Sequence, residues 1–172
     1  MGTKINMQVI NWVADIVPGY SIGGLEFEKF SLEKFKYSIR IYEKFFTIKE
    51  FLENSGTIIS IYNKKTIFRE NYDLIMDLYF NNENLLVGSR IFDDDNFCYK
   101  GKIYNECGLG DKLINLTNFG SLVIDYTGEE FHLIENKKCG TMLYCGTGSS
   151  LEEEPEQKIS GIYVFPYYEW LG

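Results

Sequence analysis

The residues of this sequence that are able to do chemistry are few and stand apart from one another. Its single histidine, His132, lies in Glu129-Glu-Phe-His-Leu-Ile, where strand alternation puts it on the face opposite Phe131 and Leu133. A histidine-based triad needs a nucleophile and an orienting acid around it. A lone imidazole is more often a satisfied strand residue than a base or a ligand. We therefore expect no catalytic residue, no cofactor and no metal site here.

The cysteines offer a second candidate chemistry. There are four of them, all in the second half of the chain: Cys98, Cys107, Cys139 and Cys145. No pair has the two-residue spacing of a zinc knuckle or a redox motif. The run from Cys139 to Cys145, followed by Gly-Thr-Gly, looks like a reactive thiol beside a glycine loop. No Lys-Ser/Thr follows these glycines, so the pattern indicates a β-hairpin with buried, reduced thiols rather than a phosphate loop.

Two acidic runs are the remaining candidates. Asp93-Asp94-Asp95 lacks the glycine and closing glutamate of a calcium loop, which favours a solvated turn. Glu152-Glu153-Glu154-Pro155-Glu156 is the most distinctive local feature, and Pro155 keeps it out of a strand ladder. Such a run is typical of a solvated loop, and equally of a surface that pairs with Lys and Arg of a partner protein. The two interpretations are compatible.

Two other classes of function stay open. A small enzyme could use paired carboxylates, for example Asp125 with Glu129 or Glu130, or the turn from Asp93 to Asp95, if their environments split the two pKa values. A small-ligand carrier would line a pocket between sheet and helices with its aromatic side chains. A large closed cavity with convergent polar groups would favour either of these. A flat acidic face with exposed rings would favour a protein that binds another protein.

The first half of the chain alternates strand and helix signals. Residues 7–17 are rich in strand-forming side chains and stop at Pro18-Gly19, and residues 20–27 predict a second short strand with a bulge or close approach at Gly23-Gly24. From Ser31, a capping residue, apolar side chains recur every three or four positions and predict a helix that ends near Phe45. A second helix is expected over residues 48–54.

Strand signals then return. Residues 57–62, 66–68, 73–80 and 85–92 predict strands, with a hairpin turn at residues 81–84. The order then starts again, with a short strand from Tyr99, a helix after Leu109 and a hairpin from Thr141 to Phe165. We expect one α+β domain over residues 1–172, an antiparallel sheet with helices on one face, built from tandem strand–helix–hairpin units at 7–92 and 97–168.

Composition and charge limit the partner. At 172 residues with 45% apolar side chains, the chain can bury a core without staples. Residues 1–86 carry 10 Lys and Arg against 11 Asp and Glu, whereas residues 87–172 carry 7 against 14, so nearly all of the net −8 lies in the second half. That field repels nucleic acid and anionic membranes and attracts a basic protein. The apolar stretch from Met7 to Val17 is interrupted by Asn11 and Asp15, which argues against a secretion signal. No run reaches the roughly 18 to 20 apolar residues of a membrane span. We therefore expect a cytoplasmic protein.

Large rings gather near the end of the chain, in Phe165-Pro-Tyr-Tyr-Glu-Trp170. They either clamp the terminus to the core or form an exposed anchor for a partner. Burial tendencies favour the clamp.

The run Ile16-Val-Pro-Gly-Tyr-Ser-Ile-Gly-Gly-Leu-Glu-Phe, followed by a helix, a hairpin and Tyr99-Lys-Gly-Lys-Ile, resembles immunity proteins of bacterial contact-dependent growth inhibition systems. The tandem order of elements also resembles the superfamily of the β-lactamase inhibitor protein and the outer-membrane-assembly lipoproteins. The first resemblance implies a cytoplasmic protein that binds and neutralises the C-terminal toxin domain of its own system, as a monomer within a heterodimeric complex. No functional residue set comes with it.

Many such toxins are basic nucleases, so an acidic binder with surplus Tyr and Trp fits the role. Inhibition would then work by occlusion of the groove that holds the nucleic-acid phosphates. The residues expected to contact the toxin are Asp93, Asp94, Asp95, Glu129, Glu130, Glu152, Glu153, Glu154, Glu156, Tyr168 and Trp170.

Overall fold

The computed structural model describes residues 10–63, 74–94, 97, 99–125, 127 and 129–171. Two short strands and one α-helix open the chain, and a six-residue 3-10 helix interrupts the strands that follow. In chain order the elements are β1 (Ser21–Ile22), β2 (Leu25–Glu26), α1 (Leu32–Tyr42), β3 (Phe46–Glu53), β4 (Gly56–Asn63), β5 (Leu74–Asn81), β6 (Leu86–Phe92), η1 (Leu113–Asn118), β7 (Ser121–Asp125), β8 (Glu130–Glu135), β9 (Lys138–Tyr144) and β10 (Gly161–Glu169).

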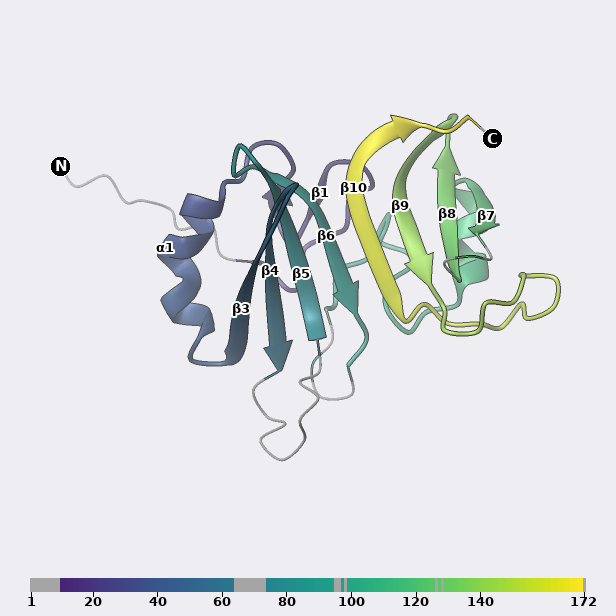
Figure 1. Ribbon diagram of the computed structural model, residues 1–172. Coiled ribbons are helices and arrows are strands. Elements are labelled where there is room, and N and C mark those ends of the chain that lie inside the picture. Colours follow the sequence, from purple (N-terminus) through teal and green to yellow (C-terminus); the bar gives the residue numbers. More distant parts are fainter. Residues whose placement is uncertain are drawn as a thin grey trace.

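Eight of the strands form one antiparallel sheet in the order β3-β4-β5-β6-β10-β9-β8-β7. The sheet consists of two four-strand meanders, β3–β6 and β7–β10, which meet where the last strand of each pairs with the other. In Figure 1, α1 lies beside β3 at one end of the sheet, and β10 crosses the middle. The described residues therefore form a mostly antiparallel β structure with one short α-helix, an α+β arrangement.

Helix α1 forms where its apolar spacing predicts. The Ser31 side chain accepts a hydrogen bond from the backbone N–H of Lys34 at 3.3 Å and so caps the first turn. Leu32, Phe35 and Tyr42 turn one stripe of the helix into the core, and the rings of Phe35 and Tyr42 stack 5.7 Å apart. The predicted helix is confirmed, although it ends at Tyr42 rather than near Phe45.

Two predictions for the first half are wrong. Residues 48–54 were expected to form a helix, but 48–53 belong to β3 and Asn54 begins the two-residue turn into β4, with which β3 pairs over its whole length. Cross-strand pairing outweighs the weak helical preference of Lys-Glu-Phe-Leu-Glu. Residues 10–17, expected in a strand, form turns and isolated bridges, and only Ile16 pairs in parallel with Ile103. Residues 7–9 lie outside the described residues.

Several strand predictions are confirmed, and others change. The hairpin around residues 81–84 is β5–β6, and β9 pairs with β10 as expected. Residues 20–27 form the two-residue strands β1 and β2, with Gly23 and Gly24 at φ 62° and 73° making the turn between them. The helix expected after Leu109 is only the 3-10 helix η1, and the segment from Tyr99 contributes an isolated bridge instead of a strand. The expected strand at residues 66–68 lies outside the described residues.

The segment before α1 ties the two meanders together. The buried hydroxyl of Tyr99 accepts a hydrogen bond from the backbone N–H of Gly23 at 2.8 Å and donates one to the carbonyl of Ala14 at 2.5 Å. Farther along, the backbone N–H of Gly19 donates to the carbonyl of Gly140 on β9. A Cβ on Gly140 would lie 2.6 Å from the Gly19 nitrogen, so only glycine allows this approach. The Pro-Gly-x-x-Ile-Gly-Gly motif thus has a structural role.

The core lies on the side of the sheet that this segment covers. Inward-facing side chains of both meanders join one continuous cluster, among them Leu78, Ile91, Phe131, Leu143 and Ile162, all 2% exposed or less. None of the helices in the described residues is long and apolar enough to cross a membrane.

Candidate interaction face

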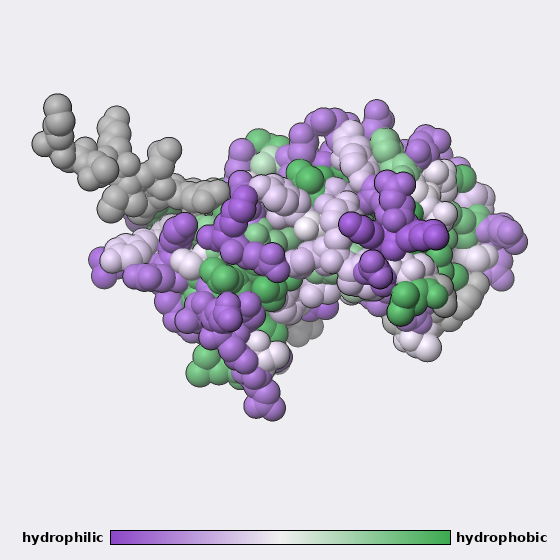
Figure 2. Space-filling model, turned by 90° about the horizontal axis from the view of Figure 1, so that it is seen from above, coloured by the Kyte–Doolittle hydropathy of each residue, from purple (hydrophilic) through white to green (hydrophobic). Residues whose placement is uncertain are grey.

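The opposite side of the sheet presents a row of large side chains. Because side chains alternate along a strand, the residues that come between the buried ones in each strand face away from the core. From β5 to β7, these outward side chains are Asp77, Tyr79, Arg90, Phe92, Tyr163, Phe165, Met142, Tyr144, Glu130, His132, Val123 and Asp125. We call this surface the open face. Seen from above, the molecule has a recess between its two halves on the side of the open face (Figure 2).

A buried ion pair lies at the centre of the open face. The Arg90 guanidinium contacts the Asp77 carboxylate at 2.9 Å, and this side chain of Asp77 is only 4% exposed, whereas that of Arg90 is 34% exposed. The hydroxyls of Ser60 and Tyr79 also donate to Asp77, at 2.6 and 3.3 Å. Burial, with the Asp77 charge nearby, raises the pKa of Tyr79, so its hydroxyl stays a donor. The central polar groups are thereby held in one arrangement.

Tyrosine rings extend this polar row toward β8. Tyr163 packs against Tyr79 with ring centroids 5.4 Å apart. Tyr144 interacts with both Arg90 and Glu130, and burial followed by the hydrogen bond with Glu130 raises the pKa of Tyr144. Tyrosine and arginine are the residue types that most often anchor protein interfaces, since they combine a large apolar surface with hydrogen bonding.

The C-terminal rings close the far end of the open face. Phe165 is 9% exposed, but Tyr168, stacked 5.6 Å from it, is 43% exposed. Trp170 is half-buried and packs 4.8 Å from the ring of His132. Tyr167, also 43% exposed, lies over Gly19 and donates to Glu135. The clamp prediction is therefore right for Phe165 and wrong for the two tyrosines.

His132 sits as predicted on the face opposite Phe131 and Leu133, but it has charged neighbours that the sequence did not reveal. Asp125 and Glu130 face each other across β7 and β8, and one oxygen of each lies within 4.8 Å of a His132 ring nitrogen and of the other oxygen. His132 is 8% exposed. The carboxylate pair that the sequence left open, Asp125 with Glu130, is thus brought together by the structure.

The predicted acidic residues lie in segments at one end of the strands, namely the end of β6, the start of β8 and the loop between β9 and β10, which Figure 1 draws at the lower side of the sheet. The backbone N–H of Asp93 donates to Ser160, at the end of the loop that carries residues 152–156, and a Cβ on Gly148 of that loop would lie 3.2 Å from the Glu129 side chain. We call this group the acidic edge: Asp93, Glu129, Glu130, Glu152, Glu153, Glu154 and Glu156. Asp94 is half-buried and accepts from Asn63 and from the backbone of Phe97, and Asp95 lies outside the described residues.

The acidic loop has a defined conformation. The side chain of Gln157, 4% exposed, donates through Nε2 to the carbonyls of Ser149, Ser150 and Glu154. The Glu153 carboxylate accepts from the backbone and hydroxyl of Ser150 at 3.0 and 3.1 Å. Glu152 and Glu156 are exposed, and Glu156 forms an ion pair with Lys112. The loop therefore holds most of its carboxylates toward solvent in a fixed conformation, so binding a partner would not have to order it.

The side chains of Tyr168 and Trp170 lie next to one member of the acidic edge, Glu130, with His132 between them. The backbones of Tyr168 and Glu130 pair at opposite ends of β9, with Cys139 and with Tyr144. Their side chains nevertheless converge on the imidazole, because the Tyr168 hydroxyl lies 3.5 Å from Nδ1 and the Glu130 carboxylate lies 3.9 Å from Nε2. The Trp170 ring packs 4.8 Å from the same imidazole.

The three thiols among the described residues are unsuited to nucleophilic chemistry. Cys107, Cys139 and Cys145 are free and buried, as the hairpin prediction implied for the last two. Burial raises the pKa of Cys107 to about 11 and that of Cys145 to about 12, which keeps both protonated near neutrality. Cys98 lies outside the described residues.

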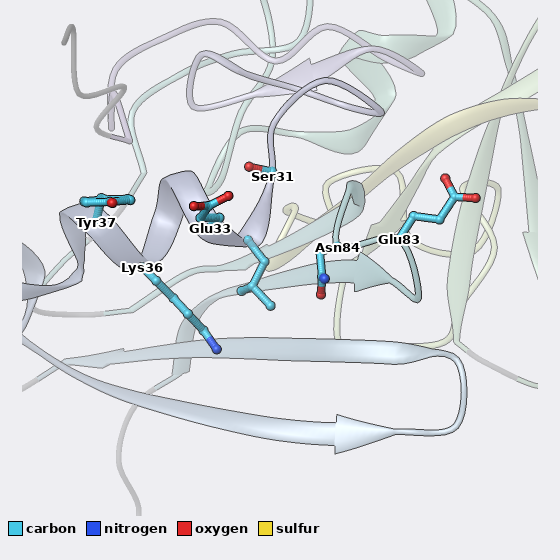
Figure 3. A pocket seen from close by; sticks show the side chains of 7 residues that line it. Ser31, Glu33, Lys36, Tyr37, Glu83 and Asn84 are labelled. Carbon is cyan, nitrogen blue, oxygen red and sulfur yellow. The ribbon is translucent and has the colours of Figure 1, made fainter.

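A hollow of about 570 Å³ lies between the start of α1 and the β5–β6 turn. Its lining side chains point in different directions, and Glu83 and Lys36 project from opposite sides (Figure 3). Lys36 pairs with Glu50 at 2.7 Å on the neighbouring strand β3. The hollow is open to solvent and lacks the convergent polar groups of a ligand pocket.

Sequence reasoning missed Asp77 and Arg90. The signal was present, because each is a charged residue inside an otherwise apolar strand, in Leu-Ile-Met-Asp-Leu and in Gly-Ser-Arg-Ile-Phe. A charge in such a position must face a partner or the open side of a sheet.

Comparisons with known proteins give one structural similarity and no family. No family model matches this chain, and no curated protein matches it. Among solved structures, it is similar to the uncharacterized protein yfeY from Escherichia coli, with 12% sequence identity and a TM-score of 0.48, over 89% of this chain and 98% of that chain.

Proposed function

We propose that this protein is an immunity-type inhibitor that binds a basic toxin domain through the open face and the acidic edge of its second meander. The carrying observation is that three acidic segments distant in sequence meet at one end of the sheet. The backbone of Asp93, after β6, bonds to Ser160, and Glu129, just before β8, lies next to Gly148; Gly148 and Ser160 flank the acidic residues 152–156 in one loop. Complementary charge of this kind steers association and selects the partner.

The half-buried rings next to that edge support the same proposal. A charged rim sets the association rate, whereas desolvated aromatic and arginine side chains supply most of the affinity. The open face offers Tyr163 and Tyr144 together with Arg90, and the rings of Tyr168 and Trp170 pack at its end against Phe165 and His132. Inhibition then proceeds by occlusion, with carboxylates in the place that nucleic-acid phosphates would take, and no turnover is needed. The complex is a heterodimer of one copy each, in the cytoplasm.

The two rival functions find less support. The hollow beside α1 is open, and its polar groups do not converge, which weakens the carrier interpretation. Asp125 and Glu130 do approach each other next to His132, the arrangement that an acid/base pair would need. Both carboxylates are only partly buried and no substrate pocket surrounds them among the described residues, so we favour another role for them, given below.

The tandem organisation remains part of the proposal. Each meander follows a helix, α1 in the first half and the shorter η1 in the second, and the last strands of the two meanders pair with each other. This arrangement supports two related units at residues 7–92 and 97–168 in a single domain.

The proposal is tested by affinity purification of the tagged chain from its native host, followed by binding kinetics with the purified partner. Replacing Glu152, Glu153, Glu154 and Glu156 with Gln should slow association several-fold. The loss should shrink as salt shortens the Debye length from about 10 Å at 0.1 M. The matched control replaces four glutamates of the first half by Gln: Glu33, Glu43, Glu53 and Glu83. This control should leave the association rate unchanged.

A ring variant separates affinity from steering. Tyr168→Ala should raise the dissociation rate at every salt concentration, by the equivalent of about 2 kcal/mol or more if the ring is an anchor. An acidic partner, or equal effects of the acidic-loop variant and its first-half control, would show that the interface lies elsewhere.

A further inference from the structure

The group formed by Asp125, Glu130 and His132 has the composition of a metal site. Asp125 ends β7 and Glu130 begins β8 directly opposite, while His132 follows two residues later and so shares their face of the sheet. One potential ligand atom from each residue lies within 4.8 Å of the other two. Around a zinc ion, with bonds of 2.0–2.2 Å, tetrahedral ligands stand about 3.3 Å apart. Closing the difference requires small shifts of these side chains.

A second observation points independently to a ligand. His132 is 92% buried, being 8% exposed, and its Nε2 has no hydrogen-bond partner among the described residues. The nearest carboxylate oxygen, on Glu130, is 3.9 Å away, which is beyond hydrogen-bond distance. A buried ring nitrogen without a partner is unfavourable, because it has lost water and gained nothing. A cation between Nε2 and the carboxylates would satisfy it.

The other side of the imidazole is arranged as in metal-binding histidines. Nδ1 lies 3.5 Å from the Tyr168 hydroxyl and 3.8 Å from the Cys139 sulfur, and the Trp170 ring packs against the imidazole. With its proton on Nδ1, directed at Tyr168, the imidazole keeps its lone pair on Nε2, toward the carboxylates.

The carboxylates are oriented as well. The backbone N–H and the hydroxyl of Thr127 both donate to Oδ1 of Asp125, at 2.8 and 2.6 Å. Tyr144 hydrogen-bonds the Glu130 side chain. Contacts of this kind fix ligating carboxylates in metal sites.

We propose that Asp125, Glu130 and His132 bind a divalent transition-metal cation of the zinc class, with its remaining position directed to the open face. An imidazole with two carboxylates suits zinc and its neighbours, whereas magnesium and calcium prefer all-oxygen shells. The negative second half of the chain adds to the attraction. This site revises the sequence expectation of a metal-free chain, and it does not depend on the proposed toxin partner.

The test is calorimetric titration of the full chain, first stripped with a chelator, with zinc chloride and separately with magnesium chloride. We expect one equivalent of zinc to bind, with magnesium far weaker. Asp125→Asn and His132→Gln should each weaken zinc binding about 10-fold or more. The matched control is Glu129→Gln, which removes the same charge from the adjacent, exposed position and should leave binding unchanged.

Two further measurements keep the result decisive. Zinc should raise the melting temperature of the unmodified chain and of Glu129→Gln, but not that of Asp125→Asn. Asp125 is half-buried at the end of a strand, so Asp125→Asn is expected to fold. X-ray absorption should find nitrogen and oxygen ligands and no sulfur. The proposal is overturned by sulfur coordination through Cys139, by zinc binding that survives His132→Gln at full strength, or by no binding of zinc up to about 1 mM.

Discussion

The two partners of the Arg90–Asp77 ion pair should differ in what their loss costs: removing Arg90 should destabilise the protein more than removing the charge of Asp77. Replacing Arg90 with Met keeps an unbranched side chain over the Phe92 ring, which the guanidinium carbon now approaches to 4.9 Å. It leaves the Asp77 carboxylate, 4% exposed, without its cation. Removing one partner of a buried pair costs about 3–5 kcal/mol, because the other charge stays buried and uncompensated.

The remaining contacts of the structure reduce this cost for Arg90→Met, and they reduce it further for Asp77→Asn. The hydroxyls of Ser60 and Tyr79 still donate to Asp77, so we expect a loss of about 2 to 3 kcal/mol for Arg90→Met. Asp77→Asn leaves a guanidinium that is 34% exposed and can bind water, so its cost should be about 1 kcal/mol. For a chain of this size the first change should lower the melting temperature by about 4–12 °C.

Urea unfolding at pH 7 of the two single variants and the double variant measures both effects and their coupling. The double variant should be more stable than Arg90→Met, since it no longer buries a charge. The reasoning is refuted if Asp77→Asn is the more destabilising change, or if Arg90→Met shifts the urea midpoint by less than the equivalent of about 1 kcal/mol.

Two other perturbations have definite expected outcomes. Gly140→Ala should destabilise the protein by about 1–3 kcal/mol in chemical unfolding, because its Cβ would lie 2.6 Å from the backbone of Gly19. Gly140 lies within strand β9 and is not among the glycines with a positive φ, so the loss reports the close approach rather than backbone strain. Above pH 9, the free energy of unfolding should fall. The folded pKa values of Cys107 and Cys145, about 11 and 12, exceed the usual value of 9.0, so the unfolded chain loses these protons first. The stability that the two protonated thiols contribute is complete below pH 9 and is lost as the pH rises through the folded pKa values. A pH series of melting temperatures from 8 to 12 checks this, and a flat profile contradicts it.

Local signals were enough to predict part of the fold. Ser31 and the apolar stripe that follows it define a helix from within the segment, and the turn at residues 81–84 defines its hairpin in the same way. Residues 48–54 contain good helix formers beside Phe51 and Leu52, and only their pairing with β4 decides for a strand. The sequence of one segment does not contain that pairing, so the prediction there was wrong.

The candidate sites depend even more on long-range arrangement. Strand alternation predicted the side of the sheet for His132, but its neighbours follow from the register between β7 and β8, which a slip of one residue would reverse. The acidic edge likewise forms because β6 and β10 are neighbours, which brings Asp93 next to the end of the acidic loop. Residue types thus identified most of the carboxylates, and the topology decided which of them meet.

The pairing of β6 with β10 has a consequence for how the chain folds as it is made. β6 ends the first meander, yet its partner β10 leaves the ribosome only some 70 residues later by the strand bounds. Until then the edge of β6 offers unpaired backbone groups to any other strand, including the β6 of a second nascent chain. Chains truncated before Gly161 should accordingly form aggregates or swapped dimers, and the completed protein should fold slowly for its size because its central contact is so distant in sequence.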